Sequence, residues 1–127
     1  MKIQHIALRV ADPDRSALFY RDLLGLPELD RQLDDAGRCR AIWLDAGGVI
    51  VMLERVLRGA GPDTGSAHVL SLAVVDRAAW EERLASAGVA IDDRTGFTLF
   101  VRDPDGHRVG LTTFDRRGGS VPAGDQR

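Results

Sequence analysis

The sequence is poor in cysteine. Among 127 residues only Cys39 carries a thiol, so the chain can form no internal disulfide and no cysteine-based metal cluster. We interpret Cys39 as a core or strand residue of a protein from a reducing compartment, and not as a nucleophile.

Basic charge and long apolar runs are also lacking. A net charge of -2 does not favour binding to nucleic acid, because nucleic-acid-binding proteins carry a basic face. No apolar run approaches the roughly 20 residues of a membrane span. The chain enters a predicted strand almost at its N-terminus, which leaves no room for a signal peptide. We therefore expect a cytoplasmic protein with no nucleic-acid or membrane partner.

The sequence does contain two copies of one pattern. Residues 8–12 read Leu-Arg-Val-Ala-Asp, and residues 72–76 read Leu-Ala-Val-Val-Asp. Further along, residues 42–48 are echoed by residues 100–106. The offset between the copies shortens along the chain, as loop deletions would produce. A unit of this length is too long for a solenoid repeat and indicates a duplicated module.

Each copy has the pattern of a strand, a helix and three further strands. In the first strand Ile6, Leu8 and Val10 alternate with His5, Ala7 and Arg9, which is the period of a half-buried strand. Helices are predicted after Asp12 and after Asp76, each closed by a glycine, Gly25 or Gly88. In the second helix the predicted apolar stripe consists of Trp80, Leu84 and Ala87. Further strands are predicted at 29–33, 40–44, 49–54, 89–92, 98–102 and 108–114.

The organisation that follows is a single α+β domain over residues 1–115. We expect module 1 at about 1–55, a glycine-rich linker at 56–66 and module 2 at about 67–115. Residues 116–127 show no periodicity and are predicted to be a disordered tail.

Three motifs in this order resemble the vicinal oxygen chelate (VOC) superfamily of glyoxalases, bleomycin-resistance proteins and extradiol dioxygenases. They are His5-Ile-Ala-Leu-Arg-Val-Ala-Asp, Phe19-Tyr-Arg-Asp-Leu-Leu-Gly-Leu, and Asp103-Pro-Asp-Gly-His-Arg-Val-Gly-Leu. The resemblance implies two tandem βαβββ modules forming a curled mixed sheet around a shared cleft. It also implies a homodimer and, in catalytic members, a divalent metal held by His and Glu from four strands.

The four metal positions that the resemblance implies are mostly without donors here. His5 matches the first ligand, whereas Met52, Val69 and Gly110 occupy the other three positions. A catalytic zinc site needs about three protein ligands, so we predict no resident metal and no cofactor. The alternative is a divalent metal at a rearranged site of His5, Glu54 and His68. That site needs a β-bulge to turn His68 inward.

Strand alternation also predicts which residues line the cleft. The expected ligand-binding side chains are His5, Arg9, Trp43, Met52, Glu54, Ser71, Arg108 and Thr112. Such a wall, apolar at its centre with a few polar groups, is typical of small-molecule sites. Arg9 matches an arginine that holds the substrate carboxylate in glyoxalase-like relatives, although it could equally be a surface arginine paired with Glu54 or an aspartate. Trp43 and Phe100 are either aromatic walls or core residues.

Three functions fit these patterns, and no catalytic residue can be assigned. The leading hypothesis is a bleomycin-resistance-like binder of a small, aromatic or amphiphilic molecule without the usual metal. The second is a metal-dependent lyase, isomerase or dioxygenase that uses the rearranged site. The third is a non-catalytic interaction module.

Overall fold

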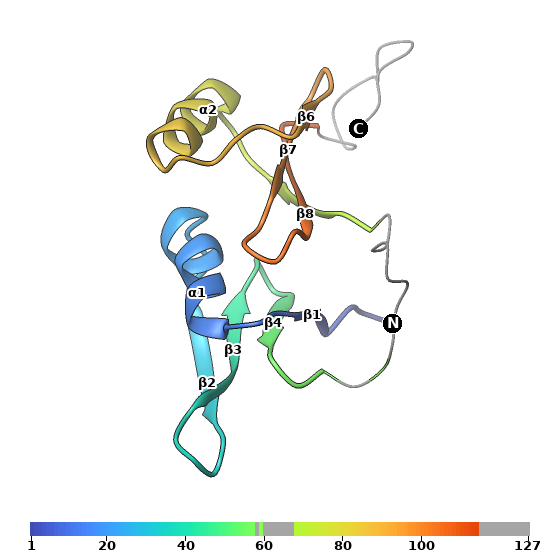
Figure 1. The fold of residues 1–127 in the computed structure, drawn as a ribbon. Coiled ribbons are helices and arrows are strands. Elements are labelled where there is room, and N and C mark those ends of the chain that lie inside the picture. Colours follow the sequence, from blue (N-terminus) through green and yellow to red (C-terminus); the bar gives the residue numbers. More distant parts are fainter. Residues whose placement is uncertain (58, 60–67, 115–127) are drawn as a thin grey trace. The chain divides into compact units, whose positions relative to one another are not determined.

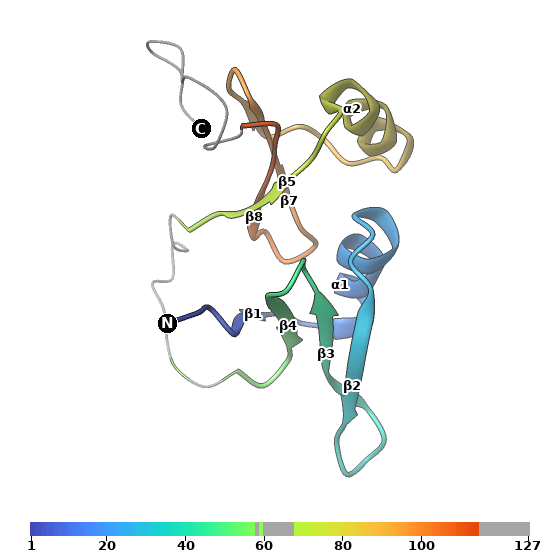
Figure 2. The same ribbon diagram turned by 180° about the vertical axis from the view of Figure 1, so that it is seen from behind.

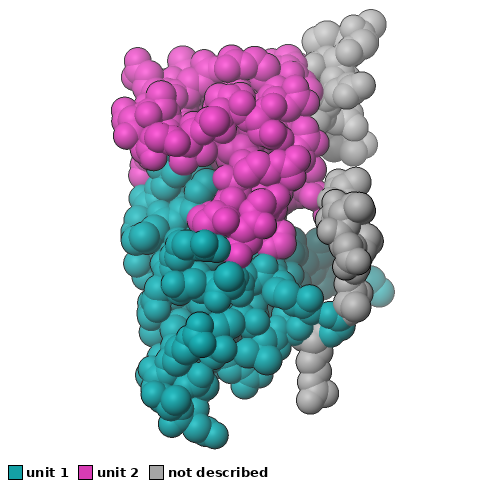
Figure 3. Space-filling model, in the orientation of Figure 1, with its two compact units in different colours: residues 1–65 teal, residues 66–127 magenta. Residues whose placement is uncertain are grey.

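The computed structural model describes residues 1–57, 59 and 68–114. The chain forms two compact units, Met1–Gly65 and Ser66–Arg127, which Figure 3 colours separately. The tail at 116–127 and most of the linker at 56–66 lie outside the described residues, so those two predictions remain untested.

Unit 1 has one four-stranded mixed sheet with the order β1-β4-β3-β2 (Figure 1). β1 runs parallel to β4, and the other neighbours are antiparallel. Its elements are β1 (His5–Arg9), α1 (Pro13–Ala17) continued by the π-helix η1 (Leu18–Leu23), β2 (Glu28–Leu33), β3 (Cys39–Asp45) and β4 (Ile50–Glu54).

Unit 2 repeats this topology, with the order β5-β8-β7-β6 and β5 parallel to β8. Figure 2 labels β5, β7 and β8 of this sheet together with α2. Each unit is therefore a βαβββ module, and the predicted fold class is confirmed. The elements of unit 2 are β5 (Leu70–Ala73), α2 (Arg77–Ser86), β6 (Asp93–Arg94), β7 (Thr98–Arg102) and β8 (Arg108–Thr112).

The helix starts follow the predicted capping chemistry. The Asp12 side chain accepts hydrogen bonds from the backbone N–H groups of Asp14 and Arg15, and Asp76 accepts one from Ala79. These contacts satisfy backbone donors that the first helical turn leaves without partners. Gly25 and Gly88 end the helices with positive φ angles of 83° and 73°. What the sequence did not predict is the wider π-helical turn of η1.

One sheet face in each unit forms the core with its helix. In unit 1 the side chains of Ile42, Leu44, Val51 and Leu53 are all fully buried on the face that α1 covers. In unit 2 the buried face is formed by Leu99, Val101, Val109 and Leu111, and Leu84 is the buried residue of α2. Complete burial of one such side chain contributes about 1.5–3 kcal/mol, so this face of each sheet is a major source of the apolar stabilisation.

Two element predictions were wrong in detail. Residues 89–92 are not a strand; the short β6 begins only at Asp93. Ala87, predicted to be part of the apolar stripe of the second helix, is exposed. Most of the other strand predictions agree with the structure to within one residue at each end. Within the described residues, no helix has the length and apolar character needed to cross a membrane.

Candidate functional site

The sheet face of unit 1 opposite α1, called here the open face of unit 1, carries the predicted binding residues of the first module. Ala7 pairs with Met52 and Met52 with Trp43, so these three side chains form one row across the strands. Arg9 pairs with Glu54 in the next row. Because residues paired across strands point to the same side, the sequence-predicted alternation holds on this face.

Arg9 lies at the end of β1, and its guanidinium contacts the backbone. Nη2 donates to the carbonyl oxygen of Leu57 at 2.6 Å and also to the carbonyl oxygen of Gly59. These bonds attach the segment after β4 to the first strand. A carboxylate ligand at Arg9 would have to compete with both carbonyls.

Glu54 is a largely enclosed charged residue of this face, with 14% of its side chain exposed. Its Oε1 lies 3.6 Å from Nη2 of Arg40, which is an ion-pair distance but longer than a hydrogen bond. The Glu54 carboxylate therefore has a cationic neighbour from its own module. His5, by contrast, is exposed, and its Nδ1 lies 3.0 Å from Oε1 of Gln4.

The corresponding face of unit 2, called the open face of unit 2, is centred on Gly110. Ser71 and Phe100 are its partners on the two neighbouring strands. A Cβ atom built on Gly110 would lie 2.8 Å from Oγ of Ser71, 3.3 Å from Cγ2 of Thr98 and 3.4 Å from Cε1 of Phe100. Three side chains of the same module thus fill the space that a side chain at 110 would need.

Polar groups surround this centre. Oγ1 of Thr98 donates to Oγ1 of Thr112 at 2.9 Å, and Thr98 is fully buried. On the other side of Gly110, Cζ of Arg108 lies 4.0 Å from the centre of the Phe100 ring. The predicted residues Ser71, Arg108 and Thr112 therefore gather on one face, and Phe100 is the aromatic residue among them.

Two buried side-chain nitrogens within the described residues lack a hydrogen-bond partner. They are Nε1 of Trp43 and Nε of Arg108. Both side chains belong to open faces, whereas the helix-facing sides have no such atom among the residues described. Unsatisfied buried donors are uncommon in native proteins and often mark functional positions.

The residues present do not fit the divalent ion of the catalytic relatives. Val69 and Gly110 offer no donor atom, and the Met52 thioether suits soft ions. A Cβ atom at position 110, the first atom of any ligating side chain there, would be crowded by Oγ of Ser71 and Cγ2 of Thr98. Among residues 1–57, 59 and 68–114, no group of three or more His, Cys, Asp or Glu side chains could hold a metal ion.

The strand register also bears on the rearranged metal site. His5 pairs with Ile50, and Glu54 lies four residues further along the same strand, a distance of about 13 Å at the usual rise of a β-strand. Metal bonds to nitrogen and oxygen are about 2 Å long, so this separation is unfavourable for one shared ion. His68 is exposed and lies just before β5 in the other unit.

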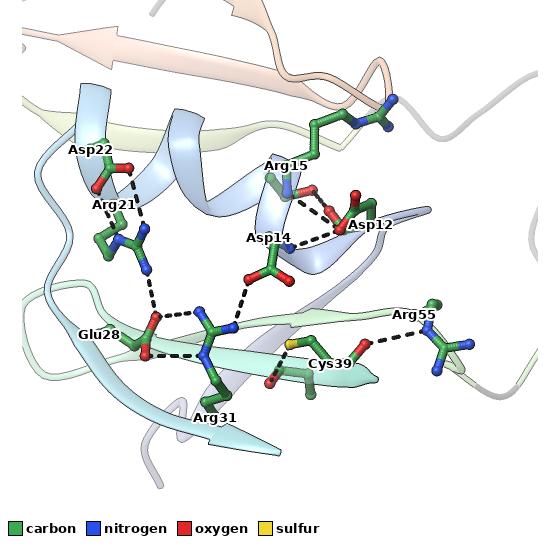
Figure 4. A network of polar contacts seen from close by, with 11 residues as sticks. Asp12, Asp14, Arg15, Arg21, Asp22, Glu28, Arg31, Cys39 and Arg55 are labelled. Carbon is green, nitrogen blue, oxygen red and sulfur yellow. Dashed lines mark hydrogen bonds and ion pairs between the residues drawn. The ribbon is translucent and has the colours of Figure 1, made fainter. Parts of the chain in front are cut away.

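A network of charged residues on the helix side of unit 1 was not predicted from the sequence (Figure 4). Glu28 on β2 accepts from Arg21 of η1 at 2.7 Å and from Arg31 at 3.2 Å, and Arg31 reaches Asp14 of α1 at 2.6 Å. The Arg31 guanidinium, followed by that of Arg21, holds the pKa of Glu28 below its ordinary value. This network joins the helix to an edge strand, away from the open face.

Cys39 lies on β3 and is buried, as its interpretation as a core or strand residue requires. Burial raises the pKa of its thiol, and Sγ contacts the carbonyl oxygen of Ala41 at 3.7 Å. Because the thiolate is the reactive form of cysteine, a raised pKa disfavours a nucleophilic role.

Comparison with known families agrees with this fold. The family model for the Glyoxalase/Bleomycin resistance protein/Dioxygenase superfamily matches residues 2–111. The chain therefore belongs to that superfamily, and the resemblance noted from its motifs is confirmed. No protein among the curated sequences matches the chain.

Solved structures show the same architecture. TioX from Micromonospora sp. ML1 is 26% identical, with a TM-score of 0.69 over 88% of this chain and 98% of that one. TnmS3, an antibiotic-binding protein from Streptomyces sp. CB03234, is 24% identical, with a TM-score of 0.69 over 88% and 94%. The fosfomycin resistance protein FosX from Listeria monocytogenes is 16% identical, with a TM-score of 0.73 over 91% and 93%.

Proposed function

We propose that this protein binds a small organic molecule on its open sheet faces, and that it does so without the divalent metal of the catalytic relatives. The observation that carries the proposal is the packing around Gly110. The position of a Cβ at residue 110 is bordered by the Ser71 hydroxyl, the Thr98 methyl group and the Phe100 ring, so the fourth metal position is occupied by two apolar groups and one hydroxyl group instead of a ligand.

The composition of the open faces supports binding more than catalysis. Met52 and Trp43 form an apolar row in unit 1, and Phe100 is the apolar centre in unit 2. Hydroxyl and guanidinium groups lie beside that centre. A mainly apolar wall with a few polar groups is the usual composition of a small-molecule site. A similar fold in TnmS3, described as an antibiotic-binding protein, adds support for a binding function of this kind.

Calorimetric titration with Zn²⁺, Ni²⁺ and Mn²⁺ tests the metal-free part of the proposal. We expect no saturable binding at one ion per chain, because His5 is the single donor at the four family positions and one ligand cannot hold such an ion. The control is His5→Ala, which should give the same titration curves as the wild type. Micromolar binding at one site per chain that His5→Ala abolishes would contradict the proposal and favour a metal-dependent enzyme.

A second measurement tests the binding part. N-phenyl-1-naphthylamine is a neutral, amphiphilic fluorophore whose emission rises in an apolar site. We expect saturable binding to the wild-type protein that EDTA leaves unchanged, because the open faces need no metal to present their apolar rows. Absence of saturable binding, or loss of binding on addition of EDTA, would contradict it.

A further inference from the structure

Arg108 and Phe100 form a stacked pair on the open face of unit 2. The two residues lie on neighbouring strands, and Cζ of Arg108 is 4.0 Å from the ring centre. This is close to van der Waals contact and well inside the roughly 6 Å range of a cation–π interaction. Because Gly110 has no side chain, the Phe100 ring can lie close to β8. Its Cε1 atom is 3.4 Å from the position that a Cβ atom of residue 110 would take. One side of the ring therefore packs against β8 at Gly110, and the Arg108 guanidinium stacks on the ring.

Two carboxylates lie beside the guanidinium and compensate its charge. Nη2 of Arg108 lies 3.3 Å from Asp93, and Nε lies 3.8 Å from Asp92. Asp92 also pairs with Arg102 at 3.1 Å, so two arginines and two aspartates form one group without net charge. The Arg108 side chain nevertheless remains 30% exposed. An anionic ligand would gain no net attraction from this group, whereas an aromatic ring can still stack on a planar guanidinium.

We propose that Arg108 is the stacking platform for a neutral, planar aromatic ligand, which would lie on the guanidinium with Phe100 beneath it. This inference rests on the proposed binding function and names its ligand class. It differs from the expectation of an anionic ligand that Arg9 would hold. The planar guanidinium recognises the aromatic face of the ligand by stacking. The charge compensation from Asp92 and Asp93 makes the site favour a ligand without charge.

Three small probes separate aromatic stacking from charge recognition. They are 2-naphthamide, which is neutral and aromatic, 2-naphthoate, its anionic counterpart, and cyclohexanecarboxamide, which is neutral but not aromatic. The readout is the Nε–Hε resonance of Arg108 in ¹H–¹⁵N spectra, identified by its loss in Arg108→Lys. We expect 2-naphthamide to move this resonance upfield through its ring current and to bind at least about threefold more tightly than 2-naphthoate. Cyclohexanecarboxamide should leave it in place.

Two variants make the test specific to stacking. Arg108→Lys keeps the charge but loses the planar group, and we expect it to weaken 2-naphthamide binding at least about fivefold, followed through backbone amide shifts of β7 and β8. The matched control is Arg94→Lys on the neighbouring strand β6, which pairs with Glu81 outside this charge group and should leave affinity unchanged. Thermal melting of both variants verifies that they fold.

Several outcomes would overturn the stacking platform. They are equal binding of 2-naphthoate, no shift of Arg108 at millimolar 2-naphthamide, or equal losses in Arg108→Lys and Arg94→Lys. If N-phenyl-1-naphthylamine still binds while Arg108→Lys has no effect on 2-naphthamide, the platform is wrong and the binding function stands. If neither compound binds, the binding function itself fails.

Discussion

Arg9 is the residue whose structural role differs most from the expectation drawn from relatives. The family resemblance makes it a candidate for holding a carboxylate, and a guanidinium is well suited to that task. In the structure its Nη2 atom donates to the carbonyl oxygens of Leu57 and Gly59 instead. Backbone carbonyls leave no sequence signal, so this partner could not be predicted from residue types. Its ligand-binding role remains a prediction.

Gly110 provides the prediction at the residue scale. Gly110→Ala places a methyl group 2.8 Å from Oγ of Ser71 and 3.3 Å from Cγ2 of Thr98, which is fully buried and hydrogen-bonded to Thr112. Overpacking of this kind costs about 1–3 kcal/mol, and we expect a loss of about 1–2 kcal/mol in the free energy of unfolding, measured by urea denaturation. Ser71→Ala should restore part of that loss, since the Ser71 hydroxyl is the nearest atom to the added methyl. Equal stability of Gly110→Ala and wild type would contradict the crowding.

At the scale of elements, the end of α2 explains the one strand that was misplaced. Val89, Ala90 and Ile91 are apolar, and this pattern indicates a strand directly after Gly88. The backbone N–H of Val89 instead donates to the carbonyl oxygen of Leu84 at 2.9 Å, and that of Gly88 donates to Ala85. This is the Schellman arrangement that closes a helix. The residue after the glycine is thereby bound to the helix and cannot begin a sheet.

The charged network between β2 and the helix gives the prediction at this scale. Glu28→Gln removes the carboxylate that Arg21 and Arg31 share, and we expect a loss of about 0.5–1 kcal/mol in unfolding free energy at pH 7, the range of a surface ion pair. Because the folded-state pKa of Glu28 is lowered, its contribution is present above the ordinary carboxyl range of about pH 4. It is lost as the pH falls through the lowered value.

Urea denaturation at pH 7, 5 and 3 measures this effect, and the difference between Glu28→Gln and wild type should shrink towards pH 3. Asp35→Asn is the matched control, because it removes one negative charge from the exposed turn after β2. A Glu28→Gln difference that stays the same at pH 3 would show that the network is not the source of the stability change.

At the scale of the whole molecule, we predict a homodimer. Relatives of this fold commonly complete their clefts with a second subunit, and symmetric pairs are the most frequent oligomers. The exposed edge strand β2, with Leu29 and Leu33 more than half exposed, adds apolar surface that a partner would cover. Sedimentation velocity at about 10 µM should give a mass near twice 13.8 kDa. A single monomeric species at that concentration would count against it.

Sequence patterns predicted the architecture well and the contacts of the site poorly. Alternation of apolar residues, the capping aspartates and the glycine stops are local signals, and they located both modules and the residues of each open face. The stacking of Arg108 on Phe100 depends on strand register, and the absence of a side chain at Gly110 shows its effect only when neighbouring strands are known. Site chemistry therefore required the structure, whereas the fold did not.

The parallel pairing of each module's first and last strands has a consequence for folding. Residue 5 pairs with residue 50 in one module, and residue 70 pairs with residue 109 in the other. Contacts so distant along the chain are slow to form because they close a long loop. During synthesis the first module cannot complete its sheet until β4 has left the ribosome. It can then close while the second module is still being translated, since chains of this kind fold from their N-terminal part onward.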